Sequence, residues 1–487
     1  MRIHRRAALA LLASLLSLFV GCGSTGNADS STPVADSVST VAHPPLPPLF
    51  DDLERRTFNF FWETANPDNG LVPDRWPSSP DFASIASVGF ALVAYVDGVE
   101  RGYITRAQAR ERVLATVRFF DRAPQGPQAS GVAGYKGFFY HWLHRRTGER
   151  WSSGVELSTI DTALLVAGML FTQAYFDGPD AGEAEIRDTV QRIYERIDWR
   201  WAQVRPPRIG MGWKPESGFI AHDYEGYDEA MILYLLALGS PTHAVEPAAW
   251  QAFTETYGRS WGSYMGQRHL GGAPLFWHQY SHLWVDFRGI RDAYMRDKGI
   301  DYFENARRAT LAQREYAIAN PGGWRDYGAD VWGLTACDGP GYILAGDYQG
   351  RTVQFHGYAA RGAGRVHTLD DGTIAPTAAA GSLPFAPEVV IPAVQAMHQR
   401  YGEVIYSAYG FTDAFNRSFT TAVKIEGGRV VPGWGWVGTD YLGIDQGPII
   451  GMIGNYRDEL VWKHMRRHPA LKRGLQRAGF SGGWLGN

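Results

Sequence analysis

The chain has 487 residues, of which 45% are hydrophobic and 20% charged, a balance typical of a globular protein with a filled core. The formal net charge of -3 argues against a nucleic-acid partner and against electrostatic capture of an acidic polymer, so a neutral substrate fits better. A large core explains most of the 24 tyrosines, but 17 tryptophans also suit a protein that stacks sugar rings on aromatic planes.

Residues 1–22 have the features of a signal peptide: a basic start, then a short apolar stretch from Ala7 to Val20. The segment ends in Phe19-Val20-Gly21-Cys22, which is similar to a lipobox, so we expect Cys22 to carry a lipid. Ordinary secretion with cleavage nearby is the alternative. The Ser-, Thr- and Pro-rich residues 23–48 are predicted to be a tether. We therefore expect an exported, periplasm-facing lipoprotein, anchored to the inner or outer membrane, whose folded domain spans residues 49–487.

Helical periodicity dominates the rest of the chain. Thr105 and Gln108 form a capping box, and Asp180 and Asp301 are analogous caps. Further helices are expected in six stretches: 157–175, 225–238, 248–257, 280–296, 387–400 and 447–465. Long Gly- and aromatic-rich loops lie between helices, at 131–151, 199–224, 320–377 and 413–445. With no repeat and no composition break, the sequence predicts one all-α domain of helical hairpins around a cavity, with loops forming a cleft at one end.

Acidic residues recur at helix starts, beside glycine and aromatic residues. These residues are Glu156, Asp161, Glu229, Asp338 and Asp445. Any one of them could simply cap its helix. As a set they suit glycosidic bond cleavage, which needs one protonated acid for the leaving oxygen and one carboxylate as base or nucleophile.

Two other chemistries are considered and disfavoured. His278, His282 and Asp286 would share one helix face and could hold zinc, but a polar face lining the cavity is the preferred interpretation, so no metal is predicted. The Gly258-Arg259-Ser260-Trp261-Gly262 segment matches the nucleophile elbow of esterases, yet a helix precedes it where a strand is required. No cofactor motif is present.

Seven motifs together resemble the bacterial glycoamylase-type domain of glycoside hydrolase family 144, the β-1,2-glucanases. They are FFWET (60–64), SIASVGF (84–90), GYKGFFYH (134–141), ELSTIDTA (156–163), DEAMILY (228–234), WGLTACDG (332–339) and GIDQGP (443–448). The resemblance implies an (α/α)6 toroid that hydrolyses β-1,2-glucan to short oligosaccharides such as sophorose with inversion. Related domains act as transglycosylases. Two segments depart from the expected pattern, at 214–223 and 427–439, and leave linkage and chain-length preference open.

With this resemblance, Glu229 is assigned as general acid and Asp445 as general base, with Asp161 and Glu156 lining the same cavity and Asp338 as a further candidate. Four residues are expected to contact sugar: Tyr135, His141, Trp332 and His282. The expected partners are a glucan and, through the lipid, a membrane; the protein is expected to be a monomer without cofactor or metal. The rivals are a non-catalytic glycan-binding lipoprotein and a polysaccharide lyase on the same toroid.

Overall fold

The computed structural model describes residues 44–420 and 424–486, within a compact unit that spans His43–Asn487. The predicted signal peptide, Cys22 and most of the predicted tether lie outside the described residues. The predicted caps are confirmed: Thr105 and Gln108 form a reciprocal capping box, and Asp180 and Asp301 accept bonds from the first turns of their helices.

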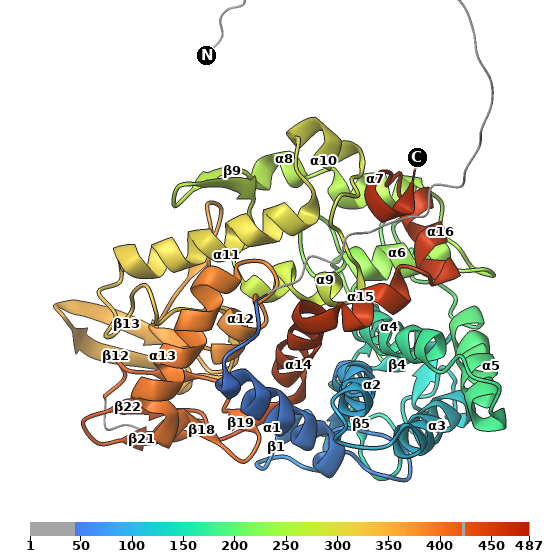
Figure 1. Cartoon of the computed structure of the whole chain (residues 1–487), viewed down its shortest axis with the longest axis horizontal. Helices are drawn as coiled ribbons and strands as arrows, with labels where there is room; N and C mark the ends of the chain where they lie inside the picture. Colours follow the sequence, from blue (N-terminus) through green and yellow to red (C-terminus); the bar gives the residue numbers. More distant parts are fainter. Residues whose placement is uncertain (1–43, 421–423, 487) are drawn as a thin grey trace, which may run out of the picture. The chain divides into compact units, whose positions relative to one another are not determined.

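Helices make up most of the regular structure (Figure 1). Their bounds are α1 Pro48–Thr64, α2 Ile85–Glu100, α3 Arg106–Arg122, α4 Thr159–Tyr175, α5 Ala181–Glu195, α6 Met231–Gly239, α7 Ala248–Thr254, α8 Tyr257–Ser260, α9 Tyr280–Trp284, α10 Ala293–Lys298, α11 Tyr302–Ala319, α12 Pro376–Ala380, α13 Pro387–Ile405, α14 Gly443–Asp458, α15 Leu460–Met465 and α16 Pro469–Arg477. Two short 3-10 helices occur at η1 Leu275–His278 and η2 Gly483–Leu485.

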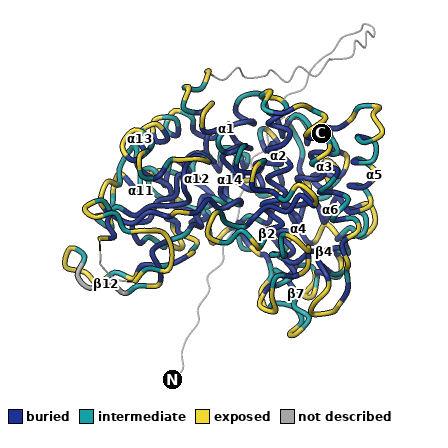
Figure 2. Tube along the Cα trace, turned by 90° about the horizontal axis from the view of Figure 1, so that it is seen from below, coloured by how far each residue is buried: buried dark blue, intermediate teal, exposed yellow. Residues whose placement is uncertain are grey.

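The helices form an inner and an outer layer. Helices α2, α4, α6 and α14 are buried on nearly every face, whereas α1, α3, α5, α13 and α16 bury one face and expose the other (Figure 2). A helix that is apolar all round must be surrounded by other elements, while an amphipathic one covers them. Accordingly α2 packs against α4 and α14, α3 packs on α5, and α16 packs on α6.

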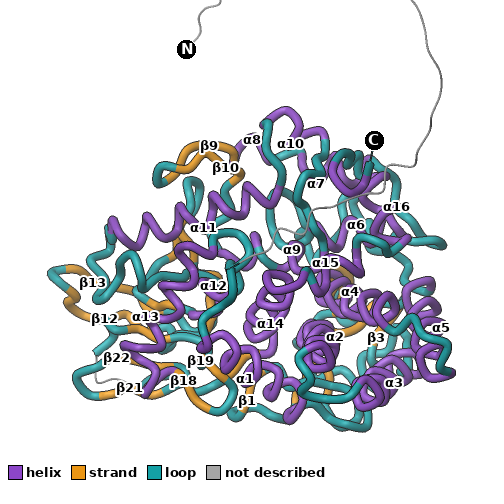
Figure 3. The backbone as a smooth tube through the Cα atoms, viewed as in Figure 1, coloured by secondary structure: helices purple, strands orange, loops and turns teal. Residues whose placement is uncertain are grey.

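The long loops contain short antiparallel strands, which the all-α prediction missed (Figure 3). Five strands form one sheet: β3 Gly134–Tyr135, β4 Phe138–Tyr140, β6 Leu157–Ser158, β7 Gly212–Lys214 and β8 Gly218–Phe219. Four form another: β17 Thr373–Ile374, β20 Phe415–Asn416, β22 Gly435–Val437 and β21 Arg429–Val431. The two-stranded pairs are β1 Arg75–Trp76 with β23 Tyr441–Leu442, β2 Phe82–Ser84 with β5 Trp142–His144, β9 Trp261–Tyr264 with β10 Gln267–Leu270, β11 Ala336–Cys337 with β14 Ala359–Ala360, β12 Ile343–Tyr348 with β13 Arg351–Phe355, β15 Gly362–Ala363 with β16 Thr368–Leu369, and β18 Tyr406–Ser407 with β19 Gly410–Phe411.

Three inner helices begin directly at the end of a strand. Strand β2 leads into α2, β6 into α4 and β23 into α14. Ser84 and Ser158, the last residues of β2 and β6, each cap the helix that follows by accepting a backbone N–H. Because the strands are paired with distant segments, the small sheets fix where these helices start, and with α4 and α14 they fix the first-turn acids Asp161 and Asp445.

Two predicted helices are interrupted. The 280–296 stretch divides into α9 and α10, because the backbone becomes extended at Val285 and Gly289 then adopts a left-handed φ of 75°. The 447–465 stretch divides at Glu459, which has a φ of 56°, into α14 and α15. Within the residues that the structure describes, no helix combines the length and the apolar character needed to cross a membrane.

Candidate active site

A cleft of about 500 Å³ opens beside the starts of α4, α6 and α14. Its wall combines carboxylic acids, two cationic side chains and aromatic rings. The acids are Asp74, Glu156, Asp161 and Glu229; the cations are Arg75 and His141; and the aromatic residues are Trp142, Tyr224, Phe276, Tyr280 and Tyr358. The helix-start acids Glu156, Asp161 and Glu229 therefore do meet in one cavity, as the sequence indicates.

Glu229 lies two residues before α6. Its carbonyl oxygen accepts a hydrogen bond of 2.7 Å from Ser281 Oγ, which in turn accepts one of 3.0 Å from the N–H of Ile232. This bridge ties the Glu229 backbone to both α6 and α9. Burial and, to a smaller extent, the negative charge of Asp161 raise the pKa of Glu229 to about 7. Glu229 therefore still holds its proton over much of the neutral range, as a general acid must.

A charged triad lies in the cleft wall at the start of α4 and consists of Asp161, His141 and Glu156. The His141 imidazole lies between the two acids, with Nδ1 2.9 Å from Glu156 Oε1 and Nε2 3.6 Å from Asp161 Oδ1. Although burial lowers it, the charges of Asp161 and Glu156 raise the pKa of His141 to about 9, so the ring is an imidazolium at neutral pH. Burial alone would raise the pKa of Glu156, but the hydrogen bond and the positive charge of His141 outweigh burial and lower this pKa.

Burial raises the pKa of Asp161, and its Oδ2 accepts a 2.5 Å hydrogen bond from Ser158 Oγ. Ligand atoms of Asp161, His141 and Glu156 lie within 4.8 Å of one another, a spacing that could also hold a metal ion. An imidazolium between two carboxylates accounts for the same arrangement through ion pairing. Asp286, which was weighed with His278 and His282 as a zinc ligand and disfavoured, lies beyond α9 and pairs with Arg288 and Arg466 at 2.7 and 2.6 Å.

Asp74 and Arg75 supply the adjoining wall. Trp142 Nε1 donates to Asp74 Oδ1 at 3.0 Å, which fixes the indole at the edge of the cleft. The Arg75 guanidinium reaches both oxygens of Asp338, at 3.2 and 3.0 Å. Burial raises the pKa of Asp74 and of Asp338, against the opposing charge of Arg75. Asp338 is thus a partner of Arg75, one layer away from the cleft surface.

Asp445, in the first turn of α14, is paired with Asp413. The two carboxyls act on each other's pKa, and each has one buried oxygen without a hydrogen-bond partner among the described residues. Asp413 Oδ2 also accepts the N–H of Asp338 at 2.6 Å. Burial and the Asp413 carboxyl raise the pKa of Asp445 well above its usual range, and burial with the charge of Asp338 raises that of Asp413 to about 7. Both side chains are almost completely buried.

Asp445 is therefore close to the cleft but does not line it. After burial, its charge is the largest cause that raises the pKa of Tyr280, which lines the cleft, so the carboxyl lies near that phenol. The charges of Glu229 and Asp161 also act on Tyr280. Tyr280 is thus the cleft residue that lies near the acids of both sides.

Three residues expected to contact sugar lie away from the cleft. Trp332 is fully buried in a hydrophobic cluster with Ile374 and Ala378. His282 is fully buried between the rings of Phe287 and Phe385. The third, Tyr135, packs against Trp201 and Trp213 on the sheet that carries β3. An aromatic residue suits a hydrophobic core as well as a binding surface, and Trp332 and His282 are core residues here.

Several cleft residues were not predicted. Arg75 and Trp142 come from the short strands β1 and β5, Asp74 from the loop just before β1, and Tyr358 from the loop before β14. Asp413, which lies behind the cleft beside Asp445, comes from the loop before β20 and was not predicted either. The Asp74-Arg75-Trp76 run has the same mixture of acid, base and aromatic residues as the motifs that were recognised, so it carried a usable signal. Asp413 had none, because nothing in its local sequence indicates a carboxyl partner.

Comparisons with known proteins agree with this architecture. The Glycoamylase family model ("Putative glucoamylase") matches residues 221–469, just over half of the chain. A solved structure from Bacteroides uniformis with the same description is 30% identical, covers 91% of this chain and 100% of its own, and has a TM-score of 0.76. An endo-β-1,2-glucanase from Chitinophaga pinensis, in complex with sophorotriose and glucose, is 29% identical, covers 89% and 98% of the two chains, and has a TM-score of 0.75.

A curated relative from Parabacteroides distasonis, an exo β-1,2-glucooligosaccharide sophorohydrolase acting at the non-reducing end, is 28% identical over 461 residues. The match covers 88% of this chain but only 57% of that relative's length. The family model therefore agrees with the sequence motifs and with the helical fold, and the chain belongs to the glycoamylase-type domain family.

Proposed function

We propose that this protein is a glycoside hydrolase that cleaves β-1,2-glucan to short oligosaccharides such as sophorose. The observation that carries the proposal is Glu229, a carboxyl whose pKa is raised to about 7 in an acid-lined, aromatic-walled cleft. Relatives with the same fold are named for β-1,2-glucan cleavage. The inner and outer helix layers support, as part of the proposal, a closed (α/α)6 toroid with the cleft at the end where α4, α6 and α14 begin.

In the proposed reaction the protonated Glu229 gives its proton to the glycosidic oxygen as the bond to the anomeric carbon breaks. A water on the opposite face of the sugar ring attacks that carbon and loses a proton to a carboxylate. We assign this base to Asp445. To act as base, the pair with Asp413 must hold a single proton between its two carboxyls, which leaves one negative charge to accept the proton of the water. An inverting pair leaves about 6.5–9.5 Å between carboxyls to admit the water.

The charged triad has a supporting role. Asp161 places a negative charge near Glu229 and so keeps the acid protonated, while His141 neutralises Asp161 and Glu156 enough for both to remain in a buried wall. Glu156, whose pKa is lowered, is an ionised acceptor for sugar hydroxyls. The aromatic side chains of Trp142, Tyr224 and Phe276 offer faces on which sugar rings can stack.

The proposal includes export as a lipoprotein anchored through Cys22 on a periplasm-facing membrane, with the catalytic unit acting as a monomer. The motif before Cys22 and the polar residues that follow support this placement. Metabolic labelling with an alkynyl fatty acid tests it. Label on the wild type and none on Cys22→Ser is expected; label on both, or on neither, contradicts it.

The activity test is incubation of the whole protein with linear β-1,2-glucan, with and without EDTA, followed by chromatography of the products. Short gluco-oligosaccharides in both arms, released first as the α-anomer in NMR spectra, are the expected result. Asp445→Asn should reduce turnover to near that of Glu229→Gln, whereas Asp161→Asn should retain more and shift the pH profile. Absence of product from β-1,2-glucan, or full activity of Asp445→Asn, contradicts the substrate or the base assignment respectively.

A further inference from the structure

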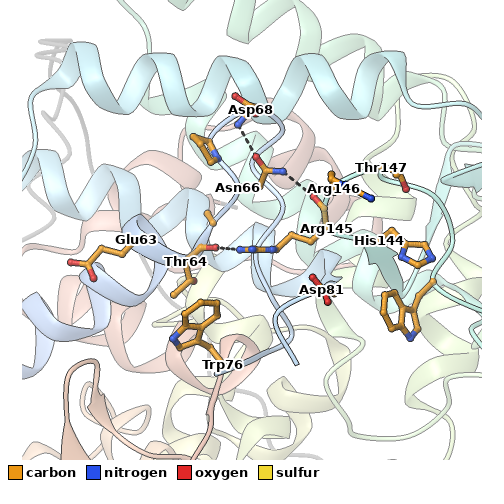
Figure 4. A pocket seen from close by; sticks show the side chains of 13 residues that line it. Glu63, Thr64, Asn66, Asp68, Trp76, Asp81, His144, Arg145, Arg146 and Thr147 are labelled. Carbon is orange, nitrogen blue, oxygen red and sulfur yellow. Dashed lines mark hydrogen bonds between the residues drawn. The ribbon is translucent and has the colours of Figure 1, made fainter. Parts of the chain in front are cut away.

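A second hollow of about 920 Å³ lies at the C-terminal end of α1, outside the acid-lined cleft (Figure 4). It is walled by the end of α1 and by the loops around Trp76, Asp81, and the turn after β5. Two partly exposed tryptophans, Trp76 and Trp151, line it together with side chains of both charge signs. We call it the Trp76 hollow; none of the residues discussed above as catalytic lines it.

The floor of the Trp76 hollow is held in place by hydrogen bonds to backbone carbonyls. The carbonyl of Arg145 accepts hydrogen bonds of 3.0 Å from the side-chain amides of Asn66 and Asn69. The Arg145 guanidinium donates to the carbonyl of Thr64 at 2.5 Å. The backbone N–H of Arg145 donates to the carbonyl of Asp81 at 2.8 Å. The turn, the end of α1 and the Asp81 loop are therefore one preformed surface, which lowers the cost of ordering on binding.

Polar groups of opposite sign face this surface without partners. Among the described residues, the exposed Asp81 carboxylate and the Arg146 guanidinium have no hydrogen bond or ion pair from their side chains. The His144 ring is tilted by 53° against the Trp151 ring, with centroids 4.4 Å apart, and its two nitrogens have no hydrogen bond among the described residues. A carboxylate that accepts, a guanidinium that donates and an indole face are the groups that recognise the hydroxyls and C–H faces of a neutral sugar.

The hollow is connected to the cleft by an unbroken series of rings. In the cleft, the ring centroids of His141 and Trp142 lie 4.5 Å apart. The Trp142 centroid lies 5.5 Å from that of Phe82, which in turn lies 5.3 Å from the centroid of Trp151. Trp142 and His144 are two residues apart on β5, so their side chains leave the strand on the same face. On β1, Arg75 lines the cleft and the next residue, Trp76, lines the hollow.

We propose that the Trp76 hollow is a remote glucan-binding site that holds glucosyl units of a long chain whose other units occupy the cleft. The inference rests on the proposed function and names a further part of it: selection by chain length. Balanced charge in the hollow and in the whole protein, at -3, suits a neutral glucan over an acidic polysaccharide. A short oligosaccharide that fills the cleft alone does not reach this surface.

The test separates binding of long and short ligands. In the Glu229→Gln background, the added changes Trp151→Ala and Asp81→Ala should each weaken binding of long linear β-1,2-glucan in affinity gels by roughly five- to tenfold. Binding of sophorotriose by calorimetry should stay unchanged. In the otherwise wild-type enzyme the same changes should raise KM for the long glucan by a similar factor and leave kcat as it is. Trp434→Ala, a partly exposed tryptophan outside the hollow, is the matched control.

Unchanged KM and gel mobility for both variants overturn the inference, and so does an equal loss of sophorotriose binding, because that places the effect in the cleft. If Trp151→Ala does not fold, Asp81→Ala still decides, since its side chain is exposed and unpaired in the described chain. Failure of the proposed function looks different: the wild type then yields no product from β-1,2-glucan. Product with unaltered KM in the variants overturns the remote site alone.

Discussion

Glu229 and Asp161 show how a residue's surroundings decide its role. Both are helix-start acids that could have been simple caps, and Asp161 does lie in the first turn of a helix whose cap is Ser158. Burial raises the pKa of both acids, and at Glu229 the negative charge of Asp161 raises it further, which favours the neutral form. Asp161 is instead placed beside an imidazolium, which favours the charged form. The pKa of both acids is raised, but a neighbouring charge adds to the effect of burial at Glu229, whereas the charge of His141 opposes it at Asp161.

The pH profile should report this difference. A general acid works only in its protonated form, and the pKa of Glu229 is raised to about 7, so we expect kcat/KM on β-1,2-glucan to fall about tenfold per pH unit above roughly pH 7. The His141 imidazolium, with a pKa of about 9, persists through this range and does not cause the fall. Glu229→Gln should lower kcat by about 10²–10⁴ and abolish the descending limb.

The matched control is Glu225→Gln, on the same loop but exposed and paired with Arg208 at 3.0 Å. It should retain wild-type kcat and the wild-type limb near pH 7. A descending limb that persists in residual Glu229→Gln activity would assign the titration to another group and remove Glu229 from the acid role.

At the scale of elements, α2 and α4 determine how closely the inner layer packs. They meet at two glycines: a methyl group on Gly89 would overlap the carbonyl oxygen of Leu164, and one on Gly168 would overlap that of Gly89. Asp161 lies in the first turn of α4, and Ser84, which caps α2, is the last residue of β2, the strand that pairs with β5. The spacing of the two helices therefore sets the position of one cleft wall.

Gly168→Ala should force this contact apart. Alanine is the better helix former by about 1 kcal/mol, but overlap with a neighbouring backbone costs roughly 1–3 kcal/mol or more, because backbone atoms cannot rotate away. We expect lower stability in denaturant titrations together with reduced activity. Gly402→Ala on α13 is the control, since its nearest neighbour would be His398 at 3.5 Å. It should be neutral or stabilising; equal losses in both variants would contradict the packing argument.

At the scale of the whole unit, the sequence predicted the parts that depend on local pattern. Periodicity and caps located most helices, and the acids beside glycine and aromatic residues at helix starts brought Glu156, Asp161 and Glu229 to one cleft. Arg75 and Trp142 were missed because their positions depend on pairing with remote segments: Arg75 lies opposite Leu442, and Trp142 opposite Ser84. The hydrophobic periodicity of a segment does not indicate which remote strand the segment pairs with. The burial of Trp332 and His282 was likewise undetermined, because an amphipathic aromatic residue suits a core and a sugar platform equally.

Ion pairs join the first two helices of the unit, α1 and α2, to α14, a helix near its C-terminus. Glu54 of α1 is only 1% exposed and lies between two arginines, with Oε1 3.2 Å from Arg101 Nε and Oε2 3.0 Å from Arg457 Nε. Arg101 follows α2, and Arg457 belongs to α14. Arg101 also reaches Asp458 at 3.1 Å. One buried carboxyl thus connects α1, α2 and α14, although the chain separates them by most of its length.

Removing this charge should weaken the closure. Glu54→Gln keeps the shape but leaves Arg101 and Arg457 facing each other without the carboxylate, and loss of one partner from a buried ion pair costs about 3–5 kcal/mol. The remaining acids, Asp97 and Asp458, reduce that cost, so we expect a fall of roughly 2–3 kcal/mol in the free energy of unfolding, measured by urea titration. Asp52→Asn on the same helix breaks an exposed pair with Arg56 at 2.8 Å and should cost less than about 1 kcal/mol. Because α14 also carries Asp445, Glu54→Gln should lower glucan turnover before global unfolding begins; full activity up to the unfolding transition would show that the closure does not position the base.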